Sequence, residues 1–302
     1  MKALVGYTGF VGSNLCENGG FDALYNSKNI ESGYGTCPDI LYYRGVPRQK
    51  FIADKFPEKD MRIIENAFEN IKKINPKNVV LISTVDVYGD TEGKDEDDVP
   101  RPLSAYGADR LRLENKVRAR YPNALVVRLP GLYGKNLKKN FIYDYINFVP
   151  ALLTDAKITQ LAQKRADIKN FYADRGDGFW AVKDGADREK LTEILKEVGF
   201  SALNFTDSRG VFQYYNLRLL GDHIEKALEN GIKVLNIATE PVSIEAIYRK
   251  LAGQTFVNHI AANPPRYDFR TKYDRIFGGK DGYILTAEYV LDDIKKFVEG
   301  AK

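Results

Sequence analysis

The chain has 302 residues, of which 44% are hydrophobic and 28% charged, an ordinary composition for a globular protein large enough to bury a substantial core. The 45 basic and 41 acidic residues nearly balance, and the net charge of +4 argues against a nucleic-acid-binding surface. The chain lacks a signal-peptide pattern and any run of about 18 apolar residues, and it contains only two cysteines, so we expect a cytoplasmic protein that does not span a membrane.

The first part of the chain alternates short apolar runs with helical patterns. Strands are predicted at residues 2–7, 23–26, 39–43, 78–84 and 124–130, and helices at 13–18, 60–74 and 104–120. The strands lack polar alternation, which is typical of a parallel sheet covered on both faces. The pattern therefore predicts an α/β fold with a Rossmann-like, doubly wound parallel sheet.

This alternation ends near residue 134. Residues 213–230 predict one more helix and 233–239 one more strand, and the remainder of the chain contains two amphipathic helix patterns around an irregular segment with prolines. We therefore expect a large domain and a smaller lobe. The large domain is expected to contain residues 1–135 and 211–240, and the smaller lobe residues 136–210 and 241–302.

Three glycines, Gly6, Gly9 and Gly12, lie in the segment GYTGFVG, directly after the first predicted strand and before a helix. In this position glycines permit a tight turn and a close approach of the backbone to a pyrophosphate, which the amides at the helix N-terminus then bind. The segment therefore predicts a dinucleotide site. A strand–helix turn that binds nothing is the alternative.

The end of the second predicted strand bears on which dinucleotide is preferred. An enzyme that prefers NAD usually places an acidic residue here, against the adenosine ribose. This chain has Asn26, Ser27 and Lys28 instead, with no carboxylate. Because Lys28 can pair with the 2′-phosphate of NADP, we expect NADP as the cofactor, with NAD possible. A solvent-facing loop lysine is the alternative.

Two further segments contain hydroxyl side chains where an open α/β sheet binds its ligand, at the carboxyl ends of the strands. STVDVYG, residues 83–89, puts Thr84 at the end of a predicted strand, and SAYGADRLRLE, residues 104–114, puts Tyr106 and Arg110 four residues apart on one helix face. With the glycine turn and the segment RLPGLYG, residues 128–134, these motifs resemble the extended short-chain dehydrogenase/reductase family. The resemblance is close over residues 1–135 and loose over the remainder.

The resemblance implies roles for these residues. Thr84 would hydrogen-bond the carbonyl or hydroxyl group of the substrate, and Tyr106 would donate or accept a proton. Where the family usually has a lysine that holds the nicotinamide ribose, this chain has Arg110. The implied cofactor-binding residues are Gly6, Gly9, Phe10, Val11, Gly12, Asn26, Ser27, Lys28 and Pro130.

Arg110 is the main departure from the family pattern. Arginine keeps the positive charge and can bond ribose hydroxyls, but it does not readily lose a proton and so cannot relay one. Two hypotheses stay open: an active oxidoreductase, or a cofactor-binding protein with little or no turnover, such as a sensor or scaffold. Arg110 could also be an ordinary surface charge, since the helix over residues 110–120 is basic throughout. This basic helix is also the single feature of the sequence that favours RNA binding.

The resemblance further implies that the later part of the chain binds a nucleotide-linked sugar. Asn140, Arg209, Gln213 and Tyr214 are candidate substrate contacts, although a basic loop and aromatic core packing are the alternatives. A reductase and an epimerase fit equally well. A dehydratase ranks third, because its acidic helper would have to be Asp86, two positions beyond Thr84.

Other chemistry finds little support in the sequence. The two histidines, His223 and His259, and the two cysteines are scattered, so no metal site is expected. The acidic run at residues 95–98 is expected to be a solvated loop. By analogy with the family we expect a homodimer formed through the helices over residues 60–74 and 104–120.

Overall fold

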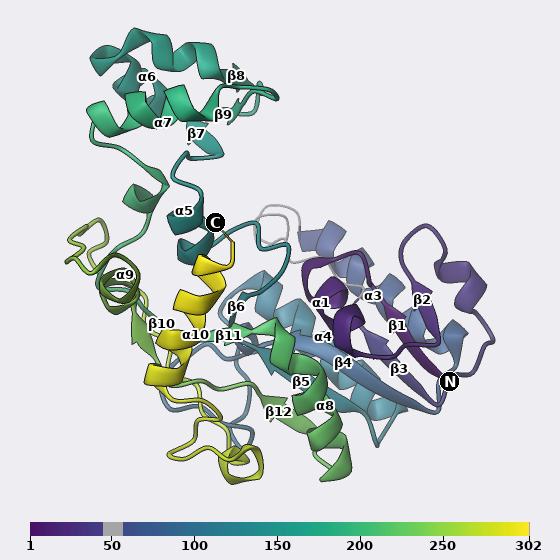
Figure 1. Ribbon diagram of the computed structural model, residues 1–302. Coiled ribbons are helices and arrows are strands. Elements are labelled where there is room, and N and C mark those ends of the chain that lie inside the picture. The colour runs from purple at the N-terminus through teal and green to yellow at the C-terminus, as the bar shows by residue number, and fades with distance from the viewer. Residues whose placement is uncertain (45–56, 302) are drawn as a thin grey trace. The chain divides into compact units, whose positions relative to one another are not determined.

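The computed structural model describes residues 1–44 and 57–301 (Figure 1). Contacts within the chain divide it into two compact units. The first contains Met1–Leu137, Val211–Val242 and Pro265–Ile294, and the second contains Lys138–Gly210, Ser243–Pro264 and Lys295–Lys302. The sequence-based division placed all of residues 241–302 in the smaller lobe, whereas residues 265–294 belong to the first unit.

The first unit is built on a six-stranded parallel sheet, which confirms the predicted fold class. Its strands stand in the order β12-β5-β4-β3-β1-β2, and every neighbouring pair is parallel. The strands are β1 (Lys2–Val5), β2 (Ala23–Tyr25), β3 (Ile40–Tyr43), β4 (Asn78–Thr84), β5 (Leu125–Leu129) and β12 (Val234–Asn236). All six lie within or at the ends of the predicted strand segments.

Helices cover both faces of this sheet (Figure 1). Leu4 of β1 packs on one face with the apolar residues of α1 (Phe10–Asn18) and α8 (Leu220–Glu229). Ala3 and Val5 point to the other face, with α3 (Pro57–Ile74) and α4 (Ala105–Arg120). Successive side chains of a strand alternate between faces, so continuous apolar strands require this three-layer arrangement.

The segment expected as one helix over residues 213–230 is divided in the structure. Its beginning forms β11 (Tyr214–Asn216), which pairs in parallel with β6 (Gly131–Tyr133), and α8 follows after a short 3-10 helix, η5 (Leu217–Leu219). The pairing partner of β11 lies about 80 residues earlier in the chain, so local periodicity does not reveal it. The other elements of the first unit are η1 (Ile30–Gly33), η2 (Val85–Val87), β10 (Val211–Phe212), η6 (Asp274–Phe277), most of α10 (Ala287–Glu299), and the first residue of β13 (Val242–Ser243).

The second unit has its own core and its own small sheet, in which β9 pairs antiparallel with both β7 and β8. Its core is formed by buried side chains between residues 148 and 200, among them Leu153, Ile158 and Leu191. Its elements are α5 (Phe141–Ile146), β7 (Leu152–Thr154), α6 (Asp155–Lys164), η3 (Ala166–Phe171), β8 (Tyr172–Asp174), β9 (Phe179–Val182), α7 (Arg188–Glu197), η4 (Ala202–Phe205) and α9 (Ile244–Ala252).

Candidate active site

The glycine turn connects β1 to α1, and its geometry requires glycine. Gly6 has a φ of 91°, in the left-handed region. A Cβ atom at Gly12 would lie 2.1 Å from the carbonyl oxygen of Gly6, so the helix packs directly on the turn. Gly9 is the N-cap of α1, with no side-chain cap and no acidic residue in the first helical turn. A pyrophosphate fits this positive helix end, because the helix supplies no anion of its own there.

Three other predicted cofactor-binding residues have buried or partly buried side chains. Val11 is buried in the core on the α1 side of the sheet, and Phe10 packs against the same core. Their side chains therefore stabilise α1, and only their backbone amides are suited to an anion. Pro130 is buried between β5 and β6.

The turn lies at the point where the order of the strands reverses. The chain runs from β1 to β2 on one side and then crosses to β3 on the other side of β1. Open α/β sheets bind ligands outside the carboxyl ends of the strands at such a point. Arg44, which sequence reasoning missed, directly follows β3, and its guanidinium lies beside Gly9. A single basic residue after an apolar strand is too common a pattern to have revealed it.

The segment after β2 forms an ordered turn. The Asn26 side chain accepts a hydrogen bond from the amide of Lys28 at 2.8 Å, and the amide of Asn26 donates to the side chain of Asn29 at 2.6 Å. Ser27 and Lys28 are exposed. The Lys28 side chain therefore lies at the surface beyond the carboxyl end of β2.

Thr84 and Tyr106 come from elements that touch each other. Thr84 ends β4 and is buried, and its hydroxyl oxygen accepts a hydrogen bond from the amide of Asp86 at 3.2 Å. Ser104 caps α4, whose first turn packs so closely on the loop after β4 that a Cβ at Gly107 would lie 2.2 Å from the carbonyl oxygen of Asp86. This contact holds the helical turn of Tyr106 against the segment that follows Thr84.

Arg110 stacks on Tyr106. Its guanidinium carbon lies 4.4 Å from the centroid of the Tyr106 ring, and the two residues are 5% and 4% exposed. A cation over the face of an aromatic ring is attracted by the ring quadrupole. The positive charge for which the family uses lysine is thus kept against Tyr106 in this chain.

A buried ion pair fastens the same helix to the sheet. Arg128 on β5 shares its Nε–H between both carboxylate oxygens of Glu114 on α4, and its Nη2 donates a further bond to Glu114 at 2.6 Å. Ser83, next to Thr84, also donates to Glu114, and Arg128 Nη1 donates to the Tyr88 hydroxyl at 2.7 Å. Burial lowers the pKa of Arg128, but its bonds to Glu114 more than offset this effect and the net direction is upward. These contacts fix α4, and with it Tyr106, relative to the end of β4.

The acidic run at residues 95–98 was wrongly expected to be only a solvated loop. The carboxylate of Glu96 accepts hydrogen bonds from the amide of Asn236 and the hydroxyl of Thr271, both at 2.7 Å. Burial raises the pKa of Glu96, and these bonds oppose the rise. Glu96 therefore joins β12 and the segment at 271 to the loop that follows β4.

Two predicted substrate contacts lie in the second unit. Asn140 is the N-cap of α5, and its side chain accepts hydrogen bonds from the amides of Ile142 and Tyr143. Arg209 donates to both carboxylate oxygens of Asp207 and to the carbonyl of Ala261. The bonds from Arg209 hold the pKa of Asp207 far below its usual range. Both side chains thus have structural partners within this unit.

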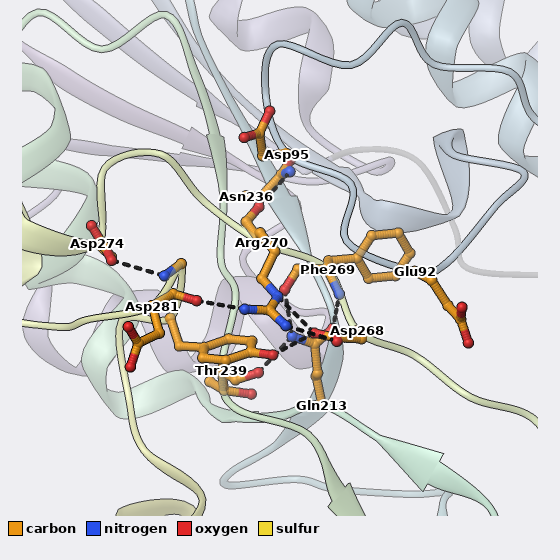
Figure 2. Close-up of polar contacts among 12 residues, drawn as sticks. Glu92, Asp95, Gln213, Asn236, Thr239, Asp268, Phe269, Arg270, Asp274 and Asp281 are labelled. Atoms are coloured by element: carbon orange, nitrogen blue, oxygen red, sulfur yellow. Dashed lines mark hydrogen bonds and ion pairs between the residues drawn. The ribbon is translucent and has the colours of Figure 1, made fainter.

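The other two candidates, Gln213 and Tyr214, are buried in the first unit. Figure 2 shows Gln213 against the segment of Asp268, Phe269 and Arg270. Its amide nitrogen donates to the carbonyls of Thr239 and Phe269, and its oxygen accepts from the amide of Phe269 at 2.7 Å. Gln213 therefore holds residues 268–270 in place, a structural role that the sequence did not indicate.

Neither a metal cluster nor a membrane-spanning helix is found in the part of the chain that the structure describes. No group of three or more His, Cys, Asp or Glu side chains among the described residues is placed to hold a metal ion. His223 is partly buried and hydrogen-bonded to the Tyr215 hydroxyl at 2.9 Å. Across residues 1–44 and 57–301, no helix is long and apolar enough to cross a lipid bilayer.

Comparisons with known proteins bear on the fold of this chain. A family model described as the RmlD substrate binding domain matches residues 35–152. A comparison with curated proteins found no match. Among solved structures, dTDP-4-dehydrorhamnose reductase from Bacillus anthracis str. Ames in complex with NADP is 17% identical, with a TM-score of 0.63 over 99% of this chain and 97% of that chain.

Epimerases have the same fold. UDP-glucose 4-epimerase from Thermotoga maritima, solved with UDP-glucose, is 14% identical, with a TM-score of 0.61 over 99% of this chain and 98% of that chain. A mutant UDP-glucuronic acid 4-epimerase from Bacillus cereus, in complex with a fluorinated UDP-sugar and NAD, is 15% identical, with a TM-score of 0.59 over 100% of both chains. The chain thus shares its fold with these nucleotide-sugar reductases and epimerases, and a family model matches part of it, residues 35–152.

Proposed function

We propose that the protein is an NAD(P)-dependent reductase or epimerase that acts by hydride transfer on a nucleotide-linked sugar. One observation carries the proposal: the glycine turn and the Thr84–Tyr106 pair belong to the same edge of the parallel sheet. The turn follows β1, Thr84 ends β4, and only β3 stands between these strands. Because parallel strands end at one edge, a dinucleotide bound at the turn can extend toward Tyr106.

The cofactor would be held mainly by backbone groups. The amides of the turn from Gly6 to Gly12 would bind the pyrophosphate, and Lys28 would pair with the 2′-phosphate of NADP. Asn26, Ser27 and Pro130 would line the same site. When bound, NAD(P) supplies or accepts the hydride.

The protein's own residues would handle the proton and the sugar oxygen. Tyr106 would give its hydroxyl proton to the sugar oxygen during reduction and take it back during oxidation, while Thr84 donates a hydrogen bond to the same oxygen. Arg110 would stabilise the negative charge that forms on Tyr106. It would stay protonated itself and take no part in proton relay.

The substrate class rests on the fold and on the relatives of this chain. Three solved structures with the same fold are named as a reductase or an epimerase of a dTDP- or UDP-linked sugar. We keep Asn140, Arg209 and Tyr214 as proposed substrate contacts, whereas the bonds of Gln213 to Thr239 and Phe269 favour a structural role. We still predict a cytoplasmic homodimer. Sedimentation of the purified protein tests whether it is a dimer.

The first test is a titration of the purified protein with NADPH and NADH, followed by energy transfer from the aromatic residues. Tighter binding of NADPH supports both the site and the role of Lys28. Equal affinities contradict the preference for NADP, and binding of neither coenzyme contradicts the proposed function. With binding in hand, UDP- and dTDP-linked sugars are screened, with Tyr106→Phe as the variant that should keep coenzyme binding and lose turnover.

Arg110 favours a second candidate, a cofactor-binding protein with little or no turnover. Here Arg110 would fix the coenzyme without supporting the proton transfer for which the family uses lysine. Arg110→Lys separates the two candidates. If the variant is active and the parent is not, the enzyme hypothesis is wrong for this chain; if the variant loses an activity of the parent, the arginine is suited to its reaction.

A further inference from the structure

Asp86 is an acidic residue in direct contact with the Thr84 hydroxyl group, and the proposed function does not use it. The Thr84 hydroxyl donates a hydrogen bond to the Asp86 carboxylate and accepts one from the Asp86 amide, both at 3.2 Å. Asp86 lies in η2, and Gly107 of α4 packs closely on its carbonyl oxygen. The backbone position of Asp86 therefore keeps both of these groups within reach of Thr84.

The two bonds limit what the Thr84 hydroxyl can offer to a ligand. A hydroxyl group has one hydrogen to donate and two lone pairs that accept. Here the hydrogen is given to the Asp86 carboxylate, and one lone pair accepts from the Asp86 amide. One lone pair remains. In this arrangement Thr84 can accept a hydrogen bond from a hydroxyl group of the sugar, but it cannot donate one to a carbonyl group.

The two forms of the sugar at the reacting carbon therefore require different things of Thr84. The hydroxyl form can donate to the remaining lone pair while the contact with Asp86 stays intact. The carbonyl form can only accept, so Thr84 must first turn its hydrogen away from Asp86. A hydrogen bond to a carboxylate is charge-assisted and stronger than one to a neutral carbonyl, so this exchange is unfavourable before the reaction begins.

We propose that Asp86 sets the direction of the Thr84 hydrogen bond and thereby makes the site prefer the hydroxyl form of its nucleotide-linked sugar over the carbonyl form. This inference rests on the proposed function and extends it to a residue that acts through Thr84. Asp86 is a positioning residue in this role and moves no proton to or from the sugar, which distinguishes the role from that of an acidic helper in a dehydratase.

The test compares dissociation constants for the hydroxyl and carbonyl forms of the UDP- or dTDP-linked sugar that the parent converts. They are measured in the Tyr106→Phe background, so that neither form is converted during the titration. Asp86→Ala frees the Thr84 hydrogen and should tighten binding of the carbonyl form about fivefold relative to the hydroxyl form. The sugar diphosphate is anionic in both forms, so loss of the Asp86 charge affects both alike and the ratio is the readout. The control Glu92→Ala removes an exposed carboxylate from the same loop and should leave the ratio unchanged.

Thr84→Val shows whether the effect depends on the hydroxyl group, because it keeps the shape of the side chain and removes that group. Asp86→Ala added to Thr84→Val should leave the ratio unchanged. The proposal is overturned if Asp86→Ala has no effect on the ratio when Thr84 is present, or has the same effect in the Thr84→Val background.

The failure of the proposed function gives a different result. A parent that binds no coenzyme or converts no sugar overturns the proposed function and this inference with it, whereas an active parent with an unchanged ratio overturns this inference alone. Circular dichroism confirms folding of each variant. Asp86→Asn, which keeps the size of the side chain and weakens the acceptor, replaces Asp86→Ala if that variant does not fold, and it should shift the ratio in the same direction.

Discussion

The ion pair of Glu114 and Arg128 is a buried charged contact beside the candidate site. Its side chains are 0% and 3% exposed, and it joins α4 to β5. Removing one partner leaves the other charge buried without compensation, which typically costs about 3–5 kcal/mol. We therefore expect Arg128→Met to lower the free energy of unfolding by about this amount, as measured by urea denaturation.

An exposed pair on α3 provides the comparison. Lys72 bonds to Glu69 at 2.9 Å, with both side chains more than 40% exposed, and such pairs contribute about 0–1 kcal/mol. Lys72→Met should therefore have a small effect. Similar losses for Lys72→Met and Arg128→Met would show that the buried pair does not hold α4 to the sheet.

His223 should make stability depend on pH. Burial lowers the pKa of His223 to about 4, with Asp222 opposing the shift. In the unfolded chain a histidine titrates near 6.5. Above that pH both states are neutral at this position; as the pH falls, the unfolded state binds the proton first, so stability is lost between about pH 6.5 and pH 4.

The expected contribution is about 2 kcal/mol between pH 7 and pH 4.5, since each pKa unit corresponds to about 1.4 kcal/mol. His223→Gln should remove this part of the pH dependence of the unfolding free energy. His259→Gln, which changes an exposed histidine, is the control. An unchanged pH dependence in His223→Gln would contradict the assignment.

Gly12 lies where α1 packs on the turn after β1, and replacing it tests whether this close packing requires glycine. A Cβ at Gly12 would meet backbone atoms of Gly6 and Tyr7, which cannot move aside as a side chain can. Gly12→Ala should therefore displace α1, lower the free energy of unfolding by about 1–3 kcal/mol, and weaken coenzyme binding. Thermal unfolding and the NADPH titration measure the two effects.

Gly221 in α8 provides the matched control, because an added Cβ there meets no atom within 4 Å. Gly221 is the second residue of α8, where alanine is favoured over glycine by at most the roughly 0.5–1 kcal/mol of a helix interior. Gly221→Ala should thus raise stability. If Gly12→Ala is also neutral or stabilising, the close contact between α1 and the turn is not required.

Residues 265–294 complete the first unit although they lie far from its other segments in the sequence. Within them, Phe269 bonds to Gln213, Thr271 to Glu96, and Asp293 to Tyr133 at 2.7 Å. Deleting residues 265–302 leaves these buried polar groups without partners, which costs about 1–3 kcal/mol each.

We expect the chain truncated after Pro264 to lose cooperative thermal unfolding by circular dichroism. A chain that ends at Glu299, the last residue of α10, should keep the transition of the full protein. Cooperative unfolding of the shorter chain at the parental temperature would show that the first unit does not need residues 265–294.

Much of the first unit was predictable because its signals are local. The strand at residues 78–84 is observed with the predicted bounds, since a run of β-branched apolar residues marks a buried strand wherever it occurs. Tyr106 and Arg110 meet because residues four apart share a helix face. The prediction of one helix over residues 213–230 was wrong at its beginning, where pairing with β6 outweighs helical periodicity.

Local pattern alone is sufficient for the parallel sheet, the glycine turn and the helix of Tyr106, because hydrophobic period and glycine position act over a few residues. The positions of Arg44, Glu96 and Gln213 depend on folding of the whole chain. Glu96 accepts a hydrogen bond from Asn236, 140 positions away, and Gln213 accepts one from Phe269, 56 positions away. Neither partner belongs to a sequence motif that would reveal the contact. Such contacts form only when the sheet brings distant segments together, so no short stretch of sequence contains their signal.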